Sequence, residues 1–432
     1  MRIGAESTTG WRATVSVAMS NYIEAGSIIA IAVSLTLWQQ EFGVDDFAVG
    51  LLAALSANAF GAAGGALVGG WMCDRFGRKF IYTYDLLVYM VGVLLAACAV
   101  SYGMLLAGFV VTGLAVGAGV PASWTFIAEQ APARDRARHV GTAQLAWSIG
   151  PMVGFALAIL VVPLGLLGSR LIFLHLFVVA GVTWWMRQGL SESTLWREAQ
   201  SEDVEPGSGA GVRALLSRRS NVTALLFLFG VYGFWNLVAG QAGIFMPRVY
   251  DAAGLASPAG QNALQVLVWG CTALATWFGF MRFGDRADIR KLYATGAVMG
   301  IVAWALLSYG PSTLPVLLCF AMLWGTSAGI GAQAFYSLWT SELFATRYRA
   351  TAQGLLFFAA RCAVGGLSYV FPVLLASQGV PVVGTLLLGF LLVALVVGVV
   401  WAPATQGRTL REIEAERYET QSSARTDTSM AE

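Results

Sequence analysis

Two side chains of opposite charge could do chemistry because each lies deep inside a long apolar stretch. Glu24 lies in SNYIEAGSIIA, about 10 residues into the run 14–38, and Arg361 lies in FFAARCAVGG, about 13 residues into 348–376. At about 1.5 Å per residue of helix, these places are roughly 15–20 Å from a helix end. A carboxylate there can exchange a proton, and a guanidinium can bind a carboxylate or a phosphate.

Charged groups at this depth of a bilayer are costly and usually functional. We therefore expect Glu24 to be a proton-coupling site, the alternative being a carboxyl that pairs structurally with a neighbouring helix. For Arg361 three interpretations stay open. It could neutralise Glu24, bind an acidic group of a substrate, or pack between helices while bonded to backbone carbonyls.

The composition predicts an integral membrane protein. The chain has 432 residues, of which 57% are hydrophobic and 12% charged, whereas a soluble domain carries about 25% charged residues. The net charge of +2 and the short, scattered clusters of cations give no indication of nucleic-acid binding.

Neither a metal centre nor an enzyme active site is indicated. The five cysteines are dispersed without a CxxC pair, and His139 and His175 are the only histidines. No nucleophile–base pattern and no phosphate-binding loop is present. We expect no cofactor, no metal and no enzymatic activity.

The elements that must position Glu24 and Arg361 are twelve predicted spans, because a spanning helix needs roughly 20 apolar residues. They lie near 14–38, 47–72, 80–100, 103–127, 138–162, 168–187, 221–247, 259–283, 290–308, 312–340, 348–376 and 379–402. We expect an all-α membrane protein with an N-terminal six-helix bundle (1–187), a cytoplasmic linker (188–220), a C-terminal six-helix bundle (221–402) and a polar cytoplasmic tail (403–432).

The distribution of basic residues predicts the orientation. With both termini in the cytoplasm, only Arg170 and Arg248 of the 26 lysines and arginines fall in outer loops. We expect a multi-pass protein of the inner or plasma membrane. Within the second span, Gly61, Gly65 and Gly69 have the small-xxx-small spacing of close helix contact.

An internal repeat links the two halves. EQAPARDRARHVG at 129–141 and ELFATRYRATAQG at 342–354 align when the first is shifted by 213 residues. The shift superposes Glu129 on Glu342, Arg134 on Arg347, Arg136 on Arg349, Ala137 on Ala350 and Gly141 on Gly354. A weaker repeat relates GGWMCDRFGRK at 69–79 to GFMRFGDRADIRK at 279–291.

Two six-helix halves in the same orientation are typical of the major facilitator superfamily, and the chain resembles it in several motifs. The superfamily's loop G-x-x-x-D-R-x-G-R-[KR] is matched by Gly70, Asp74, Arg75, Gly77, Arg78 and Lys79. QLAWSIG (144–150), LSESTLW (190–196), SELFATRYRA (341–350) and PATQGRTLREIE (403–414) resemble elements of its sugar-porter branch.

The resemblance implies a secondary transporter that moves a small polar metabolite (a sugar, polyol or sugar-acid-like compound) by alternating access, coupled to protons through Glu24 and Arg361. The alternatives are efflux of a drug or amphipathic compound by proton antiport, and an uncoupled facilitator. Phe109 occupies the position where the branch carries an arginine, so the usual arginine partner of the proton-coupling acid is absent there. The partners implied are a small-molecule substrate, protons and the lipid bilayer, with the chain acting as a monomer.

The resemblance also implies candidate residues. Gln144 has the substrate role of its motif, and Phe234 and Trp235 replace the branch's double glutamine in the seventh span. The expected substrate-binding set is Gln144, Trp147, Ser148, Trp235, Asn236, Gln241, Trp269, Tyr336, Trp339 and Arg361. The expected cytoplasmic gate is Gly70, Asp74, Arg75, Gly77, Arg78, Lys79, Glu129, Arg134, Arg136, Glu192, Asp285, Arg286, Glu342, Arg347 and Arg349.

Asp74 is expected to face the N-terminal end of the eleventh span, across the boundary between the halves. Acidic groups are favoured at helix N-termini, whose backbone N–H groups lack partners. The arginine–glutamate pairs on either side are expected to be exposed pairs of about 0–1 kcal/mol each, which bias the protein toward its outward-open state.

Overall fold

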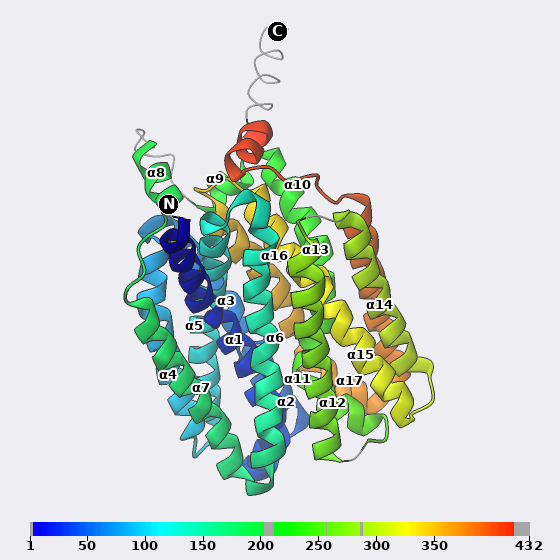
Figure 1. The fold of residues 1–432 in the computed structure, drawn as a ribbon. Helices are drawn as coiled ribbons and strands as arrows, with labels where there is room; N and C mark the ends of the chain where they lie inside the picture. The colour runs from blue at the N-terminus through cyan, green and yellow to red at the C-terminus, as the bar shows by residue number, and fades with distance from the viewer. Residues whose placement is uncertain (1–2, 203–210, 256, 286–287, 419–432) are drawn as a thin grey trace.

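A computed structural model describes residues 3–202, 211–255, 257–285 and 288–418 of the chain. It is a bundle of long helices (Figure 1), and the described residues contain no strand. The N-terminal half comprises α1 (Ile3–Phe42), α2 (Asp46–Leu55), α3 (Phe60–Phe76), α4 (Arg78–Ala97), α5 (Tyr102–Gln130), α6 (Arg136–Val161) and α7 (Leu166–Arg187), with short 3₁₀ turns η1 (Ala133–Asp135) and η2 (Val162–Leu164).

The C-terminal half contains two short π-helical segments, each of which continues directly from an α-helix. Its elements are α10 (Arg219–Leu228), η3 (Phe229–Gly233), α11 (Phe234–Ala252), α12 (Pro258–Ala275), η4 (Thr276–Phe280), α13 (Met281–Phe283), α14 (Ile289–Tyr309), α15 (Leu314–Ile330), α16 (Ala332–Leu343) and α17 (Arg349–Val400). The predicted linker is partly helical, with α8 (Thr194–Glu202) and α9 (Val212–Leu216) on either side of residues 203–210, which lie outside the described part.

Eleven described helical segments are long and apolar enough to cross a membrane. The last, Arg349–Val400, has 52 residues and would be about 78 Å long if straight, more than twice the roughly 30 Å hydrocarbon core. It is interrupted at Gly379, whose φ of 73° lies in the left-handed region. The predicted all-α membrane architecture is confirmed.

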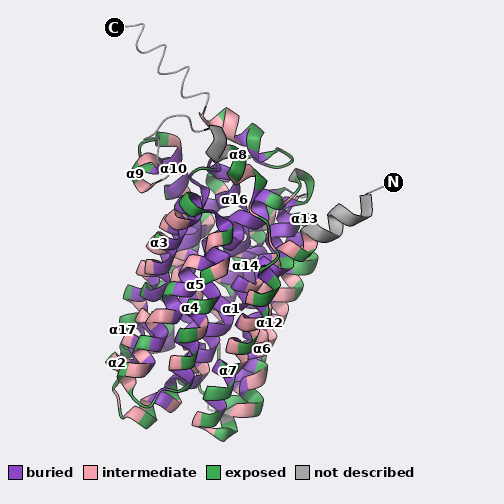
Figure 2. Cartoon of the chain, turned by 90° about the vertical axis from the view of Figure 1, so that its left-hand side faces the viewer, coloured by how far each residue is buried: buried purple, intermediate pink, exposed green. Residues whose placement is uncertain are grey.

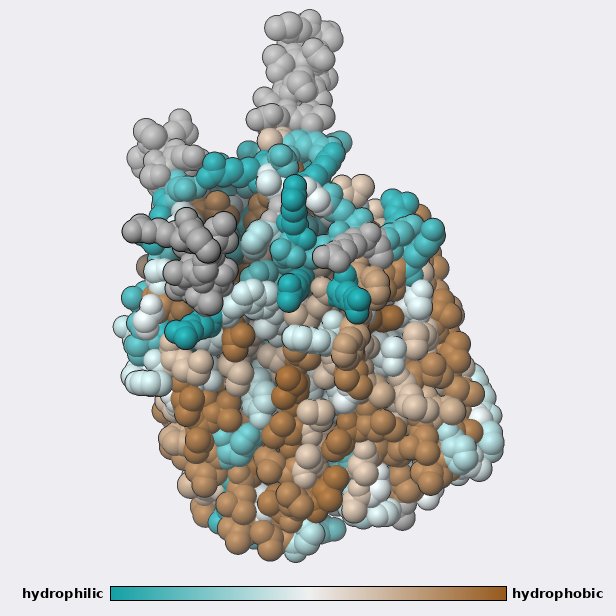
Figure 3. Space-filling view, viewed as in Figure 1, coloured by the Kyte–Doolittle hydropathy of each residue, from teal (hydrophilic) through white to brown (hydrophobic). Residues whose placement is uncertain are grey.

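The outer surface is that of a protein surrounded by lipid. Brown, hydrophobic side chains cover most of the face shown in Figure 3, whereas teal, hydrophilic ones gather at one end. Large apolar side chains such as Val68, Trp185 and Leu226 are exposed on the helices, while the interior between helices is buried (Figure 2). The hydrophilic end carries α8, α9 and the first turns of α1; we call it the linker end.

Close packing of α3 and α5 follows from the glycines of the second predicted span. A Cβ on Gly65 would lie 2.0 Å from the Leu114 carbonyl oxygen, and one on Gly69 would lie 2.4 Å from the Ala118 Cα. The predicted close contact is confirmed, because only glycine allows the two backbones to approach so far.

The second span is broken where α2 ends and α3 begins. Ser56 hydroxyl donates to the Ala53 carbonyl oxygen at 2.8 Å and accepts from the Asn58 backbone N–H at 3.1 Å. Non-helical backbone at membrane depth requires such internal partners. The break exposes the Asn58 carbonyl to the protein interior, where it becomes part of the central site.

Candidate functional site

A cross-half ion pair occupies the centre of the bundle. Glu24 of α1 and Arg361 of α17 are fully buried, and Glu24 Oε1 pairs with Arg361 Nη2. Trp147 Nε1 donates to Glu24 Oε2 at 3.0 Å. Arg361 Nη1 also donates to the Asn58 carbonyl oxygen at 2.9 Å and to Asn58 Oδ1 at 3.2 Å. Two of the three interpretations of Arg361 therefore hold together: it neutralises Glu24 and bonds to a backbone carbonyl.

The opposite half completes this network. Asn58 Nδ2 donates to the Gly240 carbonyl oxygen of α11 at 3.2 Å, and the Arg361 guanidinium lies 4.6 Å from the centre of the Phe357 ring. Glu24, Asn58 and Trp147 belong to one half, and Gly240 and Arg361 to the other. Each hydrogen bond of the network except the Trp147–Glu24 bond therefore ties the halves together.

A pocket beside the ion pair is almost filled by side chains. Its lining includes Asn58, Trp147, Asn236, Trp269 and Arg361, and its volume is about 10 Å³, roughly that needed by one water molecule. Trp147 and Trp269 meet edge to face across it with ring centres 5.1 Å apart. In this conformation the centre is contracted.

Several buried polar atoms around this centre lack a hydrogen-bond partner. Asn236 Oδ1, Trp269 Nε1 and Arg361 Nε belong to residues that line the pocket. Tyr232 Oη and Tyr336 Oη belong to neighbouring aromatic residues, whereas Trp235, with Nε1 also unpaired, lines a separate small pocket within the C-terminal half. Buried polar groups normally have partners, so such orphans call for an explanation. A set that combines N–H donors, hydroxyls and an amide oxygen is suited to a polyhydroxylated molecule, whose groups both donate and accept.

An aromatic stack extends the site toward the linker end. Tyr232 and Tyr336 stack with ring centres 3.9 Å apart, and Trp124 of the other half meets Tyr336 edge to face at 5.5 Å. Aromatic faces of this kind pack against the apolar faces of sugar-like rings while their polar edges form hydrogen bonds.

The other predicted substrate residues lie in two different settings. Gln144 Nε2 donates across the halves to the Ala328 carbonyl oxygen at 3.4 Å, which keeps it at the interface. Ser148 donates to the Gln144 carbonyl of its own helix, and Gln241 bonds to the Val364 carbonyl and to Ser368.

Trp339 packs against aromatic rings of its own half and does not line the central pocket. Ser148, Gln241 and Trp339 therefore contact their own half rather than a common cavity, which their positions in the sequence did not indicate.

Phe109 lies among aromatic rings rather than in a charged contact. Its ring packs against Trp38 at 5.4 Å and Phe173 at 6.2 Å within the N-terminal half. The fifth helix thus offers an apolar contact where the resembling branch has a cation. The guanidinium that faces Glu24 comes instead from the opposite half.

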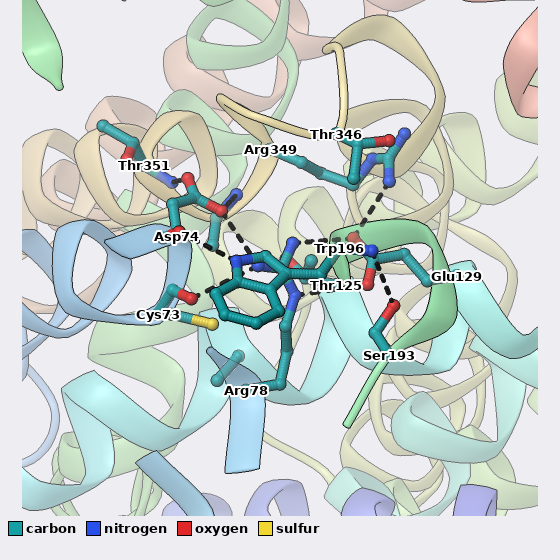
Figure 4. Close-up of polar contacts among 12 residues, drawn as sticks. Cys73, Asp74, Arg78, Thr125, Glu129, Ser193, Trp196, Thr346, Arg349 and Thr351 are labelled. Carbon is teal, nitrogen blue, oxygen red and sulfur yellow. Dashed lines mark hydrogen bonds and ion pairs between the residues drawn. The ribbon is translucent and has the colours of Figure 1, made fainter. Parts of the chain in front are cut away.

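At the linker end a second network of buried charges joins the halves (Figure 4). Arg78 contacts Glu129 at 2.7 Å and Asp74 at 3.4 Å. Arg349 of the other half reaches Glu129 at 3.1 Å. Trp196 of the linker closes over this cluster by donating to the Asp74 carbonyl oxygen at 2.8 Å.

The internal repeat appears here as a reciprocal exchange. Arg349 pairs with Glu129, while Arg136 pairs with Glu342 at 2.7 Å. In each pair the arginine comes from one half and the acid from the other. Glu342 is held further by the Thr405 hydroxyl at 2.6 Å, so the C-terminal tail takes part in the second pair.

Two aspartates bind helix N-termini across the same boundary. Asp74 accepts from the Thr351 N–H of α17 at 2.7 Å and from Ala350 at 3.3 Å. Asp285 accepts from the Ala137 N–H of α6 at 3.0 Å and from Arg138 at 3.3 Å. Burial raises the pKa of the Asp285 carboxyl, and these two hydrogen bonds lower it in part.

The expectation that the gate pairs are exposed is wrong. The side chains of Arg78, Glu129 and Arg349 are at most 1% accessible. Helices of both halves cover them, so the relevant magnitude is that of a buried pair, whose disruption by loss of one partner costs about 3–5 kcal/mol.

Of the remaining predicted gate residues, Glu192 contacts its own half. Glu192 accepts from the backbone N–H groups of Arg78 and Lys79 and thereby caps α4 in its own half. Gly77, with φ of 96°, leaves room for that carboxylate. Gly70 instead provides a close helix contact, since a Cβ there would lie 2.5 Å from the Ala350 carbonyl oxygen.

The other basic members of the predicted gate lie at the linker-end surface. Arg75 stacks on Trp71 and Phe76, and Arg347 lies over Tyr348. Lys79 and Arg134 are exposed. Arg286 lies outside the described residues.

A contact that the sequence did not indicate joins the halves at the opposite end. Arg248 of α11 donates to Gln39 Oε1 at 2.6 Å and to Asp46 Oδ1 at 3.1 Å. Asp46 is 45% and Arg248 23% accessible, so this contact is far more hydrated than the linker-end pairs. The halves are therefore connected at both ends and at the centre.

A buried pair within the N-terminal half was also missed. Arg187 of α7 lies 3.6 Å from Asp85 of α4 and donates to the Ser16 and Val17 carbonyls and the Ser20 hydroxyl of α1. The cue was Asp85, a charge within the apolar helix α4, as Glu24 is within α1. Asn58, a polar residue amid an apolar run, carried the same cue.

Comparison with known proteins agrees with this architecture. A family model described as Major Facilitator Superfamily matches residues 13–368. The minor myo-inositol transporter IolF of Bacillus subtilis is 41% identical over 411 residues, covering 94% of this chain and 93% of the relative. A cis,cis-muconate transport protein of Acinetobacter baylyi is 25% identical, covering 77% and 79%.

Among solved structures, the proton:xylose symporter XylE of E. coli has a TM-score of 0.79 at 17% identity, covering 95% of this chain and 99% of that one. This likeness concerns the fold. The family match over most of the chain, together with the helical architecture and the repeated contacts at the linker end, shows that the chain belongs to the Major Facilitator Superfamily.

Proposed function

We propose that this protein is a secondary transporter for a polyol or sugar, with a cyclic polyol of the myo-inositol class as its substrate. The observation that carries the proposal is the set of orphaned polar atoms on Asn236, Trp269 and Arg361, which line a contracted pocket between the halves. Hydroxyl groups of a polyol would satisfy both the donors and the acceptors of that set. The similarity to a myo-inositol transporter supports the same class.

The topology that fits this function has twelve spans. We take α17 to cross the membrane twice, turning at Gly379, so that each half has six spans. Both termini and the linker then lie in the cytoplasm, which places the linker end, with most of its arginines, on the cytoplasmic side. A monomer holds the whole pathway between its halves.

Alternating access follows from the positions of the cross-half contacts. The buried linker-end pairs hold the cytoplasmic side closed, and the hydrated Arg248 contact holds the outer side. Opening one side requires the bonds on that side to exchange for water. The outer contact is weaker because its charges are already partly hydrated.

Proton coupling is assigned to the Glu24–Arg361 pair. A proton on Glu24 removes the charge that holds Arg361 Nη2 and leaves this N–H group free to meet a substrate hydroxyl. Binding of substrate and protonation would then favour each other, because both remove the same cross-half bond. This linkage is what symport requires.

A second candidate is a sugar-acid or related carboxylate. Arg361 Nε lacks a partner, so the guanidinium has an N–H group left for a carboxylate. In that case the substrate carboxylate would replace Glu24 as the counter-ion of Arg361.

A counterflow assay in proteoliposomes tests the proposal. The panel should contain myo-inositol, xylose, glucuronate and a lipophilic cation, each with and without a pH gradient. We expect counterflow of myo-inositol and acceleration of its net uptake by an inward proton gradient. Glu24→Gln should abolish that acceleration while counterflow persists, whereas Glu41→Gln, an exposed acid at the other end of α1, should change neither.

Each other outcome selects a different function. Transport of glucuronate alone would favour the carboxylate candidate, and exchange of the lipophilic cation alone would indicate efflux. Uptake of myo-inositol that is indifferent to the gradient in the unaltered protein would identify an uncoupled facilitator and refute the role of Glu24.

A further inference from the structure

A groove outside the transport pocket lies between the two halves at the linker end. Its volume is about 560 Å³, within the range of about 300–1,000 Å³ that small-molecule sites occupy. Helices α1 and α6 of the N-terminal half form one side and η4 with α13 of the C-terminal half the other. The apolar lining includes Trp11, Val15, Met19, Leu145, Ile149 and Trp277.

The groove is open to the surface that faces lipid. Val15 is 45% and Trp277 52% accessible, although both are large apolar side chains. Trp277 belongs to the π-helical turn η4, and such turns are frequent at functional sites. An apolar molecule in the surrounding bilayer can therefore enter from the side.

A polar pocket of about 230 Å³ adjoins the groove and shares Arg138, Trp277 and Met281 with it. It adds Arg134 and Arg282, so three guanidinium groups surround the mouth. The guanidinium of Arg138 lies 5.4 Å from the centre of the Trp11 ring, where the apolar and polar parts meet.

The charge around the mouth suits an anion. Two aspartates, Asp135 and Asp285, line the same pocket, but Asp285 accepts the backbone N–H groups at the start of α6. None of the three arginines forms an ion pair with a described residue. Their N–H groups are thus available to a phosphate, which guanidinium groups bind in a bidentate manner.

The length of the groove matches one leaflet of a bilayer. Its lining on α1 extends from Trp11 to Tyr22, about 16 Å at 1.5 Å per residue. Half of a roughly 30 Å hydrocarbon core is about 15 Å. The arginines lie at one end of this length, where the head groups of the cytoplasmic leaflet would be.

We propose that this groove binds an anionic phospholipid, with its phosphate on Arg134, Arg138 and Arg282 and an acyl chain between α1, α6 and η4. The lipid contacts both halves at the linker end. Its binding therefore stabilises the conformation in which that end is closed, since separation of the halves would pull Arg138 away from Arg282.

Competitive lipid binding tests the site. The delipidated full-length protein in detergent is offered phosphatidylglycerol and phosphatidylcholine in equal amounts, and the lipid retained is identified by native mass spectrometry. We expect about fivefold or greater preference for phosphatidylglycerol. The double variant Arg138→Gln/Arg282→Gln should lose it, whereas the matched control Arg213→Gln/Arg219→Gln, with equal loss of charge on the same end of the bundle, should keep it.

The apolar part requires a separate variant. Ala146→Trp fills the groove without changing charge, and we expect it to lose phosphatidylglycerol as completely as the arginine variant; Val88→Trp, on an exposed position of α4, is its control. Size-exclusion profiles verify that each variant is folded.

Equal retention of the two lipids by the unaltered protein, or equal loss in the arginine control, would overturn the proposal. Phosphatidylglycerol retained by Ala146→Trp would overturn the acyl-chain assignment. Complete displacement of phosphatidylglycerol by inorganic phosphate would also overturn the acyl-chain assignment, and it would identify a site for the head group alone.

Discussion

Removing one partner of a buried cross-half pair should open the linker end. Arg136→Gln leaves the Glu342 carboxylate buried with only the Thr405 hydroxyl as a described partner. When that end opens, water reaches Glu342 and the penalty disappears. The variant therefore destabilises the closed conformation relative to the open one.

The magnitude follows from the burial of the pair. Both side chains are at most 5% accessible, and breaking a buried pair by loss of one partner costs about 3–5 kcal/mol. At about 1.4 kcal/mol per factor of ten, the lower value shifts the ratio of open to closed protein by about 100-fold. Arg136→Gln/Glu342→Gln leaves no uncompensated charge, so its shift should be less than about fivefold.

The assay is the distance distribution between spin labels at Lys79 and Lys291, exposed residues at the linker-end starts of α4 and α14. The five native cysteines are replaced in the background used for labelling. Arg411→Gln serves as a control, because its pair with Glu198 is exposed and should contribute about 0–1 kcal/mol.

Two results would refute this reasoning. One is a shift by Arg136→Gln no larger than that of the Arg411 control. The other is a double variant that opens as far as the sum of the single variants, since that would show that the two charges do not interact. Arg349→Gln should shift the ratio less than Arg136→Gln, because Glu129 keeps Arg78 as a charged partner.

The remaining predictions concern the opposite end and the helix contacts. Arg248→Gln should raise the labelling rate of Ala239→Cys in the central pocket from outside by at most about fivefold, because the contact that it removes is partly hydrated; a hundredfold rise would contradict this. Gly70→Ala should raise the free energy of the closed form relative to the open form by about 1–3 kcal/mol, since its Cβ would overlap the Ala350 carbonyl oxygen. The linker-end distances should therefore shift toward those of the open form. Gly366→Ala, where nothing lies within 4 Å of the added Cβ, should leave them unchanged.

Much of the linker-end network could be predicted from the sequence. The 213-residue shift identified Glu342 as the equivalent of Glu129 and Arg349 as the equivalent of Arg136. Duplication preserves the positions of charges that face the same boundary. The spacing could not show that each arginine pairs with the acid of the other half. Nor could it show that these pairs are buried, since burial depends on how closely the helices approach.

The central site depended more strongly on the tertiary structure. Glu24 and Arg361 were noticeable because charges in apolar stretches are rare, yet three interpretations of Arg361 remained open. No proline marks the helix break at Ser56–Asn58 in the sequence, so Asn58 was not predicted as a residue of the central site. Trp339 and Gln241 were assigned to the site although they pack within their own half.

By itself the sequence determined the membrane class, the all-helical architecture, the internal repeat of charged motifs and the identity of the charged residues. These properties follow from composition, segment length and repetition, all of which are features of the linear sequence. Only the tertiary structure decided that Glu24 meets Arg361, 337 residues away, and that the halves are joined at the centre and at both ends. Such contacts depend on the rotation of each helix about its axis and on the distance between helices, and packing sets both.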